Sequence, residues 1–182
     1  MSVADKWLNC IQVFSPDGNY LRQMGAKGTS PGHFRSPEGI AVDARGFIYV
    51  ADTCNDRVQV SSQSGASRAD CFICLSMEQV LDRDGVFVRE LGRVMQMTLP
   101  GGRLYQKREF NEPTGVAVSS SGDRIAVCDF GNCRIKVFGA NGERLASFGF
   151  RGTQRGQFQK PECVVMDEMG KWPEADENCC AV

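Results

Sequence analysis

The chain has 182 residues, of which 42% are hydrophobic and 24% are charged, and its formal net charge is -1 at pH 7. This length and composition suit one globular domain with a buried core. No run approaches the roughly 18 apolar residues of a membrane span, and the N-terminus MSVADKWLNC lacks the apolar segment of a signal peptide, so we expect a cytoplasmic protein that does not bind membranes.

Short apolar runs divided by turn residues predict β-strands along most of the chain. In chain order they are VAD (3–5), a run from Ile11, DGNYLRQMG (17–25), IAVD (40–43), IYVAD (48–52), RVQV (57–60) and LDRDGVFVRELG (81–92). The series then returns as VAVSSSGDRIAVCDFGNCRIKVF (116–138) and NGERLASFG (141–149), and it ends with ECVVMD (162–167). Each full unit is a meander of four strands, named a, b, c and d below.

The units follow a repeat of 47 to 48 residues once two extra segments are left out. The d strands close at Gly25, Gly92 and Gly149, which are 67 and 57 residues apart. Leaving out residues 61–80 shortens the first interval to 47, and leaving out nine extra residues between Gly92 and Pro113 shortens the second to 48. We therefore interpret 61–80 as an inserted loop that leaves its unit intact.

The connection from strand d to the next strand a repeats a frame of glycines, GxxGxxxGxFxxP. It occurs from Gly25 to Pro37 and again from Gly149 to Pro161. Glycine serves tight turns, and a proline just ahead of strand a costs little because its φ is fixed and its missing N–H is not needed there.

A four-stranded unit repeated at roughly 40 to 50 residues indicates a β-propeller, because each blade buries its faces only against neighbouring blades. The chain supplies strands b, c and d, then two complete units, then one strand a, which make about three blade-equivalents. Closed propellers usually have about four to eight blades. We therefore predict an all-β fold, a partial propeller of four-stranded antiparallel blades over residues 1–170, with a polar tail outside the repeat at 171–182.

Two segments carry a family resemblance. FRSPEGIAVDARGFIYVADTCNDRVQV and FNEPTGVAVSSSGDRIAVCDFGNCRIKVF resemble NHL repeats, and the similarity covers nearly the whole chain apart from 61–80 and the tail after Gly170. The resemblance implies a six-bladed ring and a role like that of the C-terminal propeller of tripartite-motif NHL proteins, which recognises RNA or protein targets. Nothing in the sequence resembles a RING finger, a B-box or a coiled coil, so ubiquitin transfer is not expected of this chain.

Enzymes among NHL-like propellers are the alternative class. Relatives of the peptidyl-hydroxyglycine lyase hold zinc with several histidines, whereas this sequence has one, His33, which we expect in a solvated loop. Lactonase-like propellers hold calcium with acidic and amide side chains. Asp52 with Asn55 and Asp129 with Asn132 fit that chemistry, but they stand at equivalent points of successive units, so we expect hydrogen bonds within loops instead.

Neither the cysteines nor the arginines that open strand c indicate a catalytic or metal site. Nine scattered cysteines favour reduced thiols over a disulfide framework, and the single CxxC, at 71–74, lacks a second pair for a closed zinc site, so no metal or cofactor is expected. Arg57 and Arg134 are expected to pack against loops or neighbouring units. The first unit has Leu8 and Cys10 where the others have Asn and Arg, which predicts an altered bc loop.

Charge is divided between the two ends of the predicted units. In a four-stranded meander the da and bc connections emerge at one end and the ab and cd turns at the other. The da connections (26–36, 93–112 and 150–160) hold nine basic residues against only Glu109 and Glu112, while the opposite turns hold eight acidic and four basic residues. The basic residues are Lys27, Arg35, Arg93, Arg103, Lys107, Arg108, Arg151, Arg155 and Lys160.

A basic face of this kind suits a phosphate backbone or an acidic protein segment. We therefore predict a binding module without catalytic activity, with RNA or an acidic protein segment as its partner, and keep the propeller enzyme as the alternative. The strand inventory also suggests a homodimer, in which two copies each donate strand a (162–167) to complete a six-bladed ring.

Overall fold

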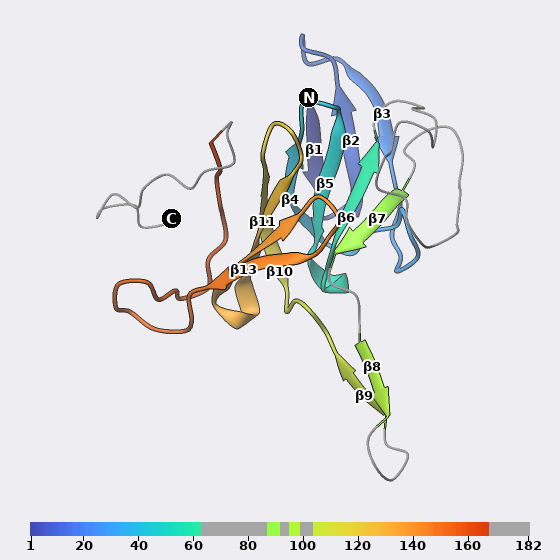
Figure 1. The fold of residues 1–182 in the computed structure, drawn as a ribbon. Coiled ribbons are helices and arrows are strands. Elements are labelled where there is room, and N and C mark those ends of the chain that lie inside the picture. The colour runs from blue at the N-terminus through green and yellow to red at the C-terminus, as the bar shows by residue number, and fades with distance from the viewer. Residues whose placement is uncertain (63–86, 92–94, 99–103, 168–182) are drawn as a thin grey trace.

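A computed structural model describes residues 1–62, 87–91, 95–98 and 104–167, and every structural statement below concerns these residues. Three antiparallel sheets follow one another along the chain, and each keeps its strands in sequence order (Figure 1). The first holds β1 (Ser2–Asp5), β2 (Cys10–Phe14) and β3 (Tyr20–Met24). The second holds β4 (Pro37–Val42), β5 (Phe47–Asp52), β6 (Arg57–Ser62) and β7 (Phe87–Leu91). The third holds β10 (Pro113–Val118), β11 (Arg124–Asp129), β12 (Arg134–Gly139) and β13 (Arg144–Phe148).

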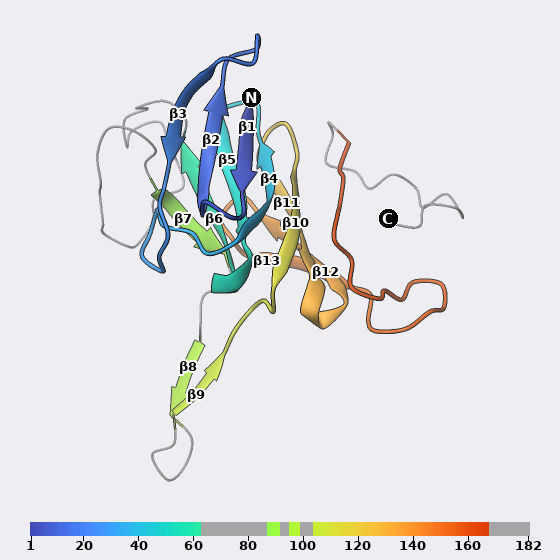
Figure 2. The same ribbon diagram turned by 180° about the vertical axis from the view of Figure 1, so that it is seen from behind.

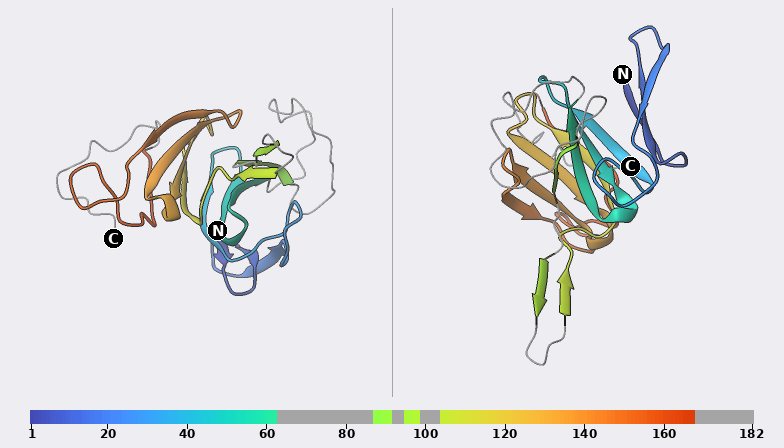
Figure 3. Two further views of the ribbon diagram at one scale, coloured as in Figure 1. Left: turned by 90° about the horizontal axis from the view of Figure 1, so that it is seen from below. Right: turned by 90° about the vertical axis from the view of Figure 1, so that its right-hand side faces the viewer.

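These sheets are the predicted blades. The first is the b, c, d set and the other two are complete a, b, c, d units, so the all-β prediction is confirmed. Short 3-10 helices, η1 (Thr53–Asn55) and η2 (Phe130–Asn132), form the bc loops of the two complete units. Seen from behind, β1–β3 lie in front of the other two sheets, and the views from below and from the side show the three sheets stacked as consecutive blades (Figures 2 and 3).

Three strand boundaries differ from the sequence-based expectation. β4 and β10 begin at Pro37 and Pro113 themselves, because each proline sits opposite the aspartate that ends strand b and a bulge follows before regular pairing resumes. β6 continues through Ser62, since Ser61 and Ser62 pair with Ile48 and Phe47. The first two residues of the predicted insertion therefore belong to strand c, and its remainder, 63–80, lies outside the described residues.

The strand predicted at 162–167 is wrong as a sheet element. Residues 161–167 form no strand, because no described strand follows them to act as strand b of their own unit. They nevertheless run beside β10, where Thr114 Oγ1 donates to the carbonyls of Pro161 and Glu162 at 3.3 and 3.2 Å. The segment thus lies where the innermost strand of a next blade belongs, and its exchange between two copies stays a prediction.

The extra residues between Gly92 and Pro113 contain a hairpin that the repeat does not require. β8 (Met95–Thr98) and β9 (Leu104–Lys107) pair antiparallel with each other and with no other described strand. The hairpin projects away from the three sheets, as Figures 1 and 3 show. Its origin in a da connection places it at the same end of the molecule as the other da loops.

The core consists of two apolar layers, one between each pair of consecutive sheets. Ile11, Val13, Met24, Phe34, Ile48 and Val50 form the first. Tyr49, Val58, Val60, Leu91, Phe110, Val116, Ile125, Val127 and Phe138 form the second. The phenylalanine three residues before each strand-a proline, Phe34 or Phe110, lies in the layer just before its own sheet. Burying such layers between blades is what stabilises a propeller.

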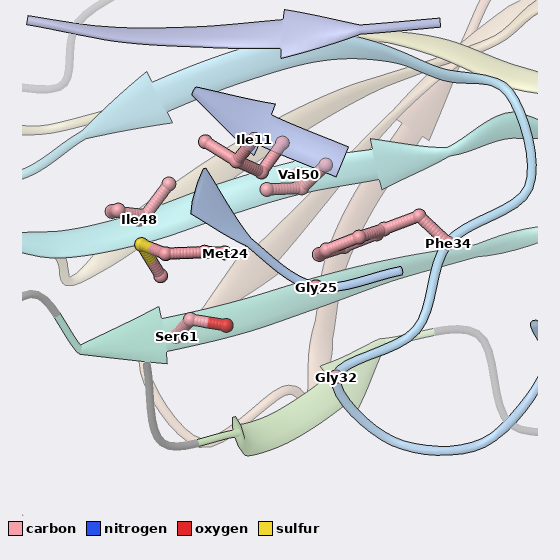
Figure 4. A pocket seen from close by; sticks show the side chains of 8 residues that line it. All are labelled: Ile11, Met24, Gly25, Gly32, Phe34, Ile48, Val50 and Ser61. Atoms are coloured by element: carbon pink, nitrogen blue, oxygen red, sulfur yellow. The ribbon is translucent and has the colours of Figure 1, made fainter. Parts of the chain in front are cut away.

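The glycine frame allows this insertion of phenylalanine. A Cβ added to Gly25 would lie 2.4 Å from the Phe34 ring, and the φ of Gly25 is +77°, so both space and backbone conformation require glycine. Figure 4 shows the Phe34 ring beside Gly25 in a small apolar pocket of the first layer, lined also by Ile11, Met24 and Ile48. The pocket is part of the packing between blades, and we assign it no ligand.

Candidate functional site

The bc and da loops gather at one end of the sheets, as the sequence predicts (Figure 1, lower end). We call this end the loop face; it comprises the bc loops 6–9, 53–56 and 130–133 and the da loops 25–36, 108–112 and 149–160. The ab turns lie at the opposite end, where the Ala44 N–H donates to the Ser120 carbonyl at 3.0 Å. Propeller loops of one end form a continuous surface on a rigid scaffold, which is where binding residues concentrate.

The two copies of the glycine frame fold into the same closed loop. The Phe34 N–H donates to the Ala26 carbonyl at 2.8 Å, and the Phe158 N–H donates to the Phe150 carbonyl at 3.0 Å. Lys27 and Arg151 occupy equivalent bridge positions in the two loops. The repeat therefore presents a basic side chain from the same point of the first and third da loops.

In the second sheet a buried carboxylate fixes the da loop to the bc loop. Asp52 is fully buried and accepts hydrogen bonds from the Arg35 N–H at 2.7 Å and from the side chains of Asn55, Arg57 and Gln59 at 2.8, 2.8 and 2.9 Å. Arg57 also donates to the His33 carbonyl at 2.9 Å. The expectation that Asp52 and Asn55 make loop hydrogen bonds, and that Arg57 packs against a loop, is confirmed.

The third sheet repeats this network around Asp129. Its carboxylate accepts from the Asn111 N–H at 2.8 Å, from the Asn132 side chain at 2.8 and 3.0 Å and from Arg134 Nε at 2.7 Å. Lys136 stands where Gln59 stands in the second sheet, and its buried ammonium lies 3.6 Å from Asp129. Both carboxylate oxygens of each aspartate accept hydrogen bonds from protein groups. The two aspartates therefore hold the loops together as structural residues.

The buried Lys136 is balanced by Glu109 at the edge of the loop face. Lys136 Nζ lies 2.6 Å from Glu109 Oε1 and 5.0 Å from the centre of the Phe110 ring. Burial opposes ionisation of Glu109, but the hydrogen bond and charge of Lys136 outweigh it, so the pKa of this carboxyl is lowered. One of the two acidic groups predicted on the da loops is thus committed to an internal ion pair.

Successive blades are tied together by one residue of each of the first two bc loops. Asn9 and Asp56 both have left-handed backbone conformations, with φ of 58° and 53°. Asn9 Oδ1 accepts from the Ser36 N–H at 3.0 Å, and Asp56 Oδ1 accepts from the Glu112 N–H at 2.8 Å. Each bond joins a bc loop to the residue before the strand-a proline of the next unit, so the loop face is continuous across both blade boundaries.

Six of the nine predicted basic residues have described side chains, and all six are exposed: Lys27, Arg35, Arg108, Arg151, Arg155 and Lys160. Arg93 and Arg103 lie outside the described residues, and Lys107 is in β9 with a side chain that is not described. Arg108 forms an ion pair with Asp56, and Lys160 lies over the Phe130 ring at 5.0 Å. Lys27, Arg35 and Arg151 form no ion pair within the described part of the chain.

Two acidic groups close to the loop face already form ion pairs, and exposed Glu112 is the remaining acidic residue of the described da loops. Glu38 lies 2.6 Å from Lys6, whose pKa its hydrogen bond and charge raise, and Asp56 pairs with Arg108. Exposed positive charge on the loop face therefore exceeds the negative charge available to neutralise it. Such an excess attracts polyanions.

Sequence reasoning missed the most exposed aromatic residue of the loop face. Trp7, in the bc loop between β1 and β2, is 87% exposed, and the neighbouring Leu8 is 61% exposed. The altered bc loop predicted from Leu8 and Cys10 is confirmed, because Asp5 here binds Gln12 and the Leu8 N–H in place of an Asn and an Arg. The departure from the repeat was the available signal, but it did not reveal that an indole points to solvent.

Two further features bear on enzyme and membrane alternatives. Among the described residues no group of three or more His, Cys, Asp or Glu side chains is placed to hold a metal ion. The described part of the chain also contains no helix that is both long and apolar enough to span a bilayer. His33 lies exposed in its da loop, as expected.

Comparison with known proteins gives one family match and several distant relatives. The NHL repeat profile matches residues 34–60 and 110–138, which hold the Asp52 and Asp129 networks. Protein brain tumor of Drosophila melanogaster is 28% identical over 145 residues, covering 71% of this chain and 14% of that protein. E3 ubiquitin-protein ligase TRIM32 of Homo sapiens is 44% identical over 46 residues, covering 25% of this chain and 7% of that protein. The chain thus spans a small fraction of the length of either relative.

Two solved structures align with part of the chain. A functionally unknown protein from Desulfotomaculum acetoxidans aligns with a TM-score of 0.42 at 13% identity, over 84% of this chain and 38% of that one. The hydrazine synthase of Kuenenia stuttgartiensis aligns with a TM-score of 0.36 at 11% identity, over 93% of this chain and 63% of that one.

Proposed function

The chain carries NHL repeats and is distantly homologous to Brain tumor and TRIM32, and we propose from this premise that it is a non-catalytic binding module whose loop face takes single-stranded RNA. The observation that carries the proposal is the excess of exposed cations on that face. Lys27, Arg35 and Arg151 form no ion pair within the described residues, whereas the nearby acids Glu38 and Asp56 are already paired. Phosphate groups supply the missing negative charge.

The arrangement of the cations favours an extended ligand. Lys27 and Arg35 belong to the first da loop and Arg151 to the third, and both loops are seen in the view from below (Figure 3, left). A flexible phosphate backbone can contact both loops, and binding to it releases counterions. The apparent affinity then falls with salt, with a slope in log units of about -0.7 for each phosphate contacted.

Charge reversal on the loop face tests the proposal. The triple variant Arg151→Glu, Arg155→Glu and Lys160→Glu is expected to bind a uridine oligonucleotide at least about tenfold more weakly and to show a shallower salt slope. Fluorescence anisotropy at several salt concentrations measures both quantities. Equal affinity of the wild type and the triple variant for the oligonucleotide would show that RNA does not bind to this face.

A matched pair of single variants controls for net charge. Arg151→Glu on the loop face and Arg124→Glu at the opposite end each change the net charge by the same amount, and both side chains are exposed. Only Arg151→Glu should weaken RNA binding. An acidic peptide that binds in place of the oligonucleotide, with the same dependence on Arg151, would instead identify a protein partner.

A further inference from the structure

The indole of Trp7 is exposed on the loop face instead of packing between blades. Its 87% exposure is the largest among the exposed apolar side chains of the described residues, and burial of an aromatic ring of this size is normally favourable. It lies on the loop face, in the bc loop that departs from the repeat. An exposed aromatic residue on a face rich in cations needs an explanation other than blade packing.

The loop that carries Trp7 is fixed on both sides by hydrogen bonds. Asp5 Oδ1 accepts from the Leu8 N–H at 2.9 Å, and Asn9 Nδ2 donates to the Trp7 carbonyl at 3.0 Å. Asn9 in turn accepts from the Ser36 N–H of the next da loop at 3.0 Å. The backbone is therefore held in place while the indole faces solvent, so a ligand that covers the ring orders little else.

One cation lies in the bc loop of Trp7, and another lies in the da loop to which this bc loop is hydrogen-bonded. Lys6 directly precedes Trp7, and its ammonium is held 2.6 Å from Glu38. Arg35 precedes Ser36, the residue that the Trp7 loop binds, and its side chain is exposed. A flat aromatic surface on the same face as an arginine that forms no ion pair within the described residues matches a nucleotide, which offers a base to stack and a phosphate to pair. An acidic peptide offers carboxylates but needs no such ring.

We propose that Trp7 is a stacking platform for one base of the bound single strand, with the adjacent phosphate held by Arg35. This inference rests on the proposed function and adds a contact that charge alone does not supply. Stacking on aromatic side chains is tolerant of sequence, so Trp7 contributes affinity in a way that salt weakens far less than the phosphate contacts.

The test uses the intrinsic fluorescence of Trp7. The chain has two tryptophans, so Trp172→Phe leaves Trp7 as the sole indole. Addition of a uridine oligonucleotide should quench its emission. Trp7→Ala should weaken binding about tenfold, as expected for loss of one stacked base, while Trp7→Phe should retain most of the affinity. Tyr20→Ala, which removes another exposed aromatic ring from β3, is the matched control and should bind like the wild type.

The outcomes separate this inference from the proposed function. Salt-dependent RNA binding with unchanged Trp7 emission and equal affinity of Trp7→Ala would overturn the stacking role and leave the RNA-binding face intact. No oligonucleotide binding at all, or binding of a poly-glutamate peptide instead, would overturn both. Because Trp7 is exposed, its variants should keep the wild-type circular dichroism spectrum and thermal midpoint, which shows that any loss of affinity is local.

Discussion

Removal of the Asp52 carboxylate is the sharpest test of how the loop face is held together. Asp52→Ala takes away the acceptor of four hydrogen bonds, three of them from side chains and one from the Arg35 backbone. It also leaves the Arg57 guanidinium, whose side chain is 10% exposed, without its 2.8 Å partner. Loss of one member of a buried ion pair costs about 3 to 5 kcal/mol, which is a large part of the stability of a typical domain.

Urea unfolding followed by circular dichroism measures this cost. Asp17→Ala, in the exposed turn between β2 and β3, is the control and should change the free energy of unfolding by less than about 0.5 kcal/mol. Asp52→Asn keeps the shape and one acceptor oxygen, so it should fall between the two. In the double variant Asp52→Ala, Arg57→Met the cost should be smaller than the sum of the single variants, because no buried charge is stranded. If Asp52→Ala were as stable as Asp17→Ala, the network would not be what joins the da loop to the bc loop.

Three further predictions concern the core and its edges. The difference in the free energy of unfolding between the wild type and Glu109→Gln should be constant above about pH 4.5 and should shrink as the pH falls toward the lowered pKa of Glu109. The reason is that protonation of Glu109 ends its pairing with Lys136. Urea titrations at several pH values measure this difference. Burial raises the pKa of the Cys128 thiol to about 12. Iodoacetamide at pH 8 should therefore label the exposed Cys163 and leave Cys128 unlabelled. Peptide mapping by mass spectrometry measures the labelling of each cysteine. Gly39→Ala should lower the free energy of unfolding by about 1 to 3 kcal/mol, because its Cβ would lie 2.2 Å from a carbonyl oxygen of β10; a stability equal to that of the wild type would mean the blades are not packed this closely.

The strand order was predictable from the sequence because alternating runs and turn residues repeat with nearly constant spacing. Asp52 and Asp129 were predictable as structural residues for the same reason, because each stands beside an Asn and an Arg at equivalent points of successive units. The strand expected at 162–167 failed because pairing requires a neighbour, which the pattern of one segment cannot supply.

The hairpin β8–β9 and the exposure of Trp7 show what the pattern did not reveal. The sequence identified residues 95–107 only as part of an extra segment in the repeat. The Pro-Gly-Gly at 100–102 is nevertheless a turn signal between two short runs that can form strands. An aromatic residue beside a strand is more often core than surface, and only the packing of the altered bc loop decides which it is. The position of the six described basic residues on the loop face was predictable, since charge on da connections follows from strand order, whereas their role in binding stays a prediction.

Ultraviolet cross-linking of a uridine oligonucleotide, with the linked peptides identified by mass spectrometry, tests the central claim that the loop face binds RNA. We expect cross-links within the bc loop 6–9 and the da loops 25–36 and 149–160, with Trp7 among the linked residues, and their loss at high salt. Cross-links confined to the ab turns at 43–46 and 119–123, or no cross-links at low salt, would contradict it.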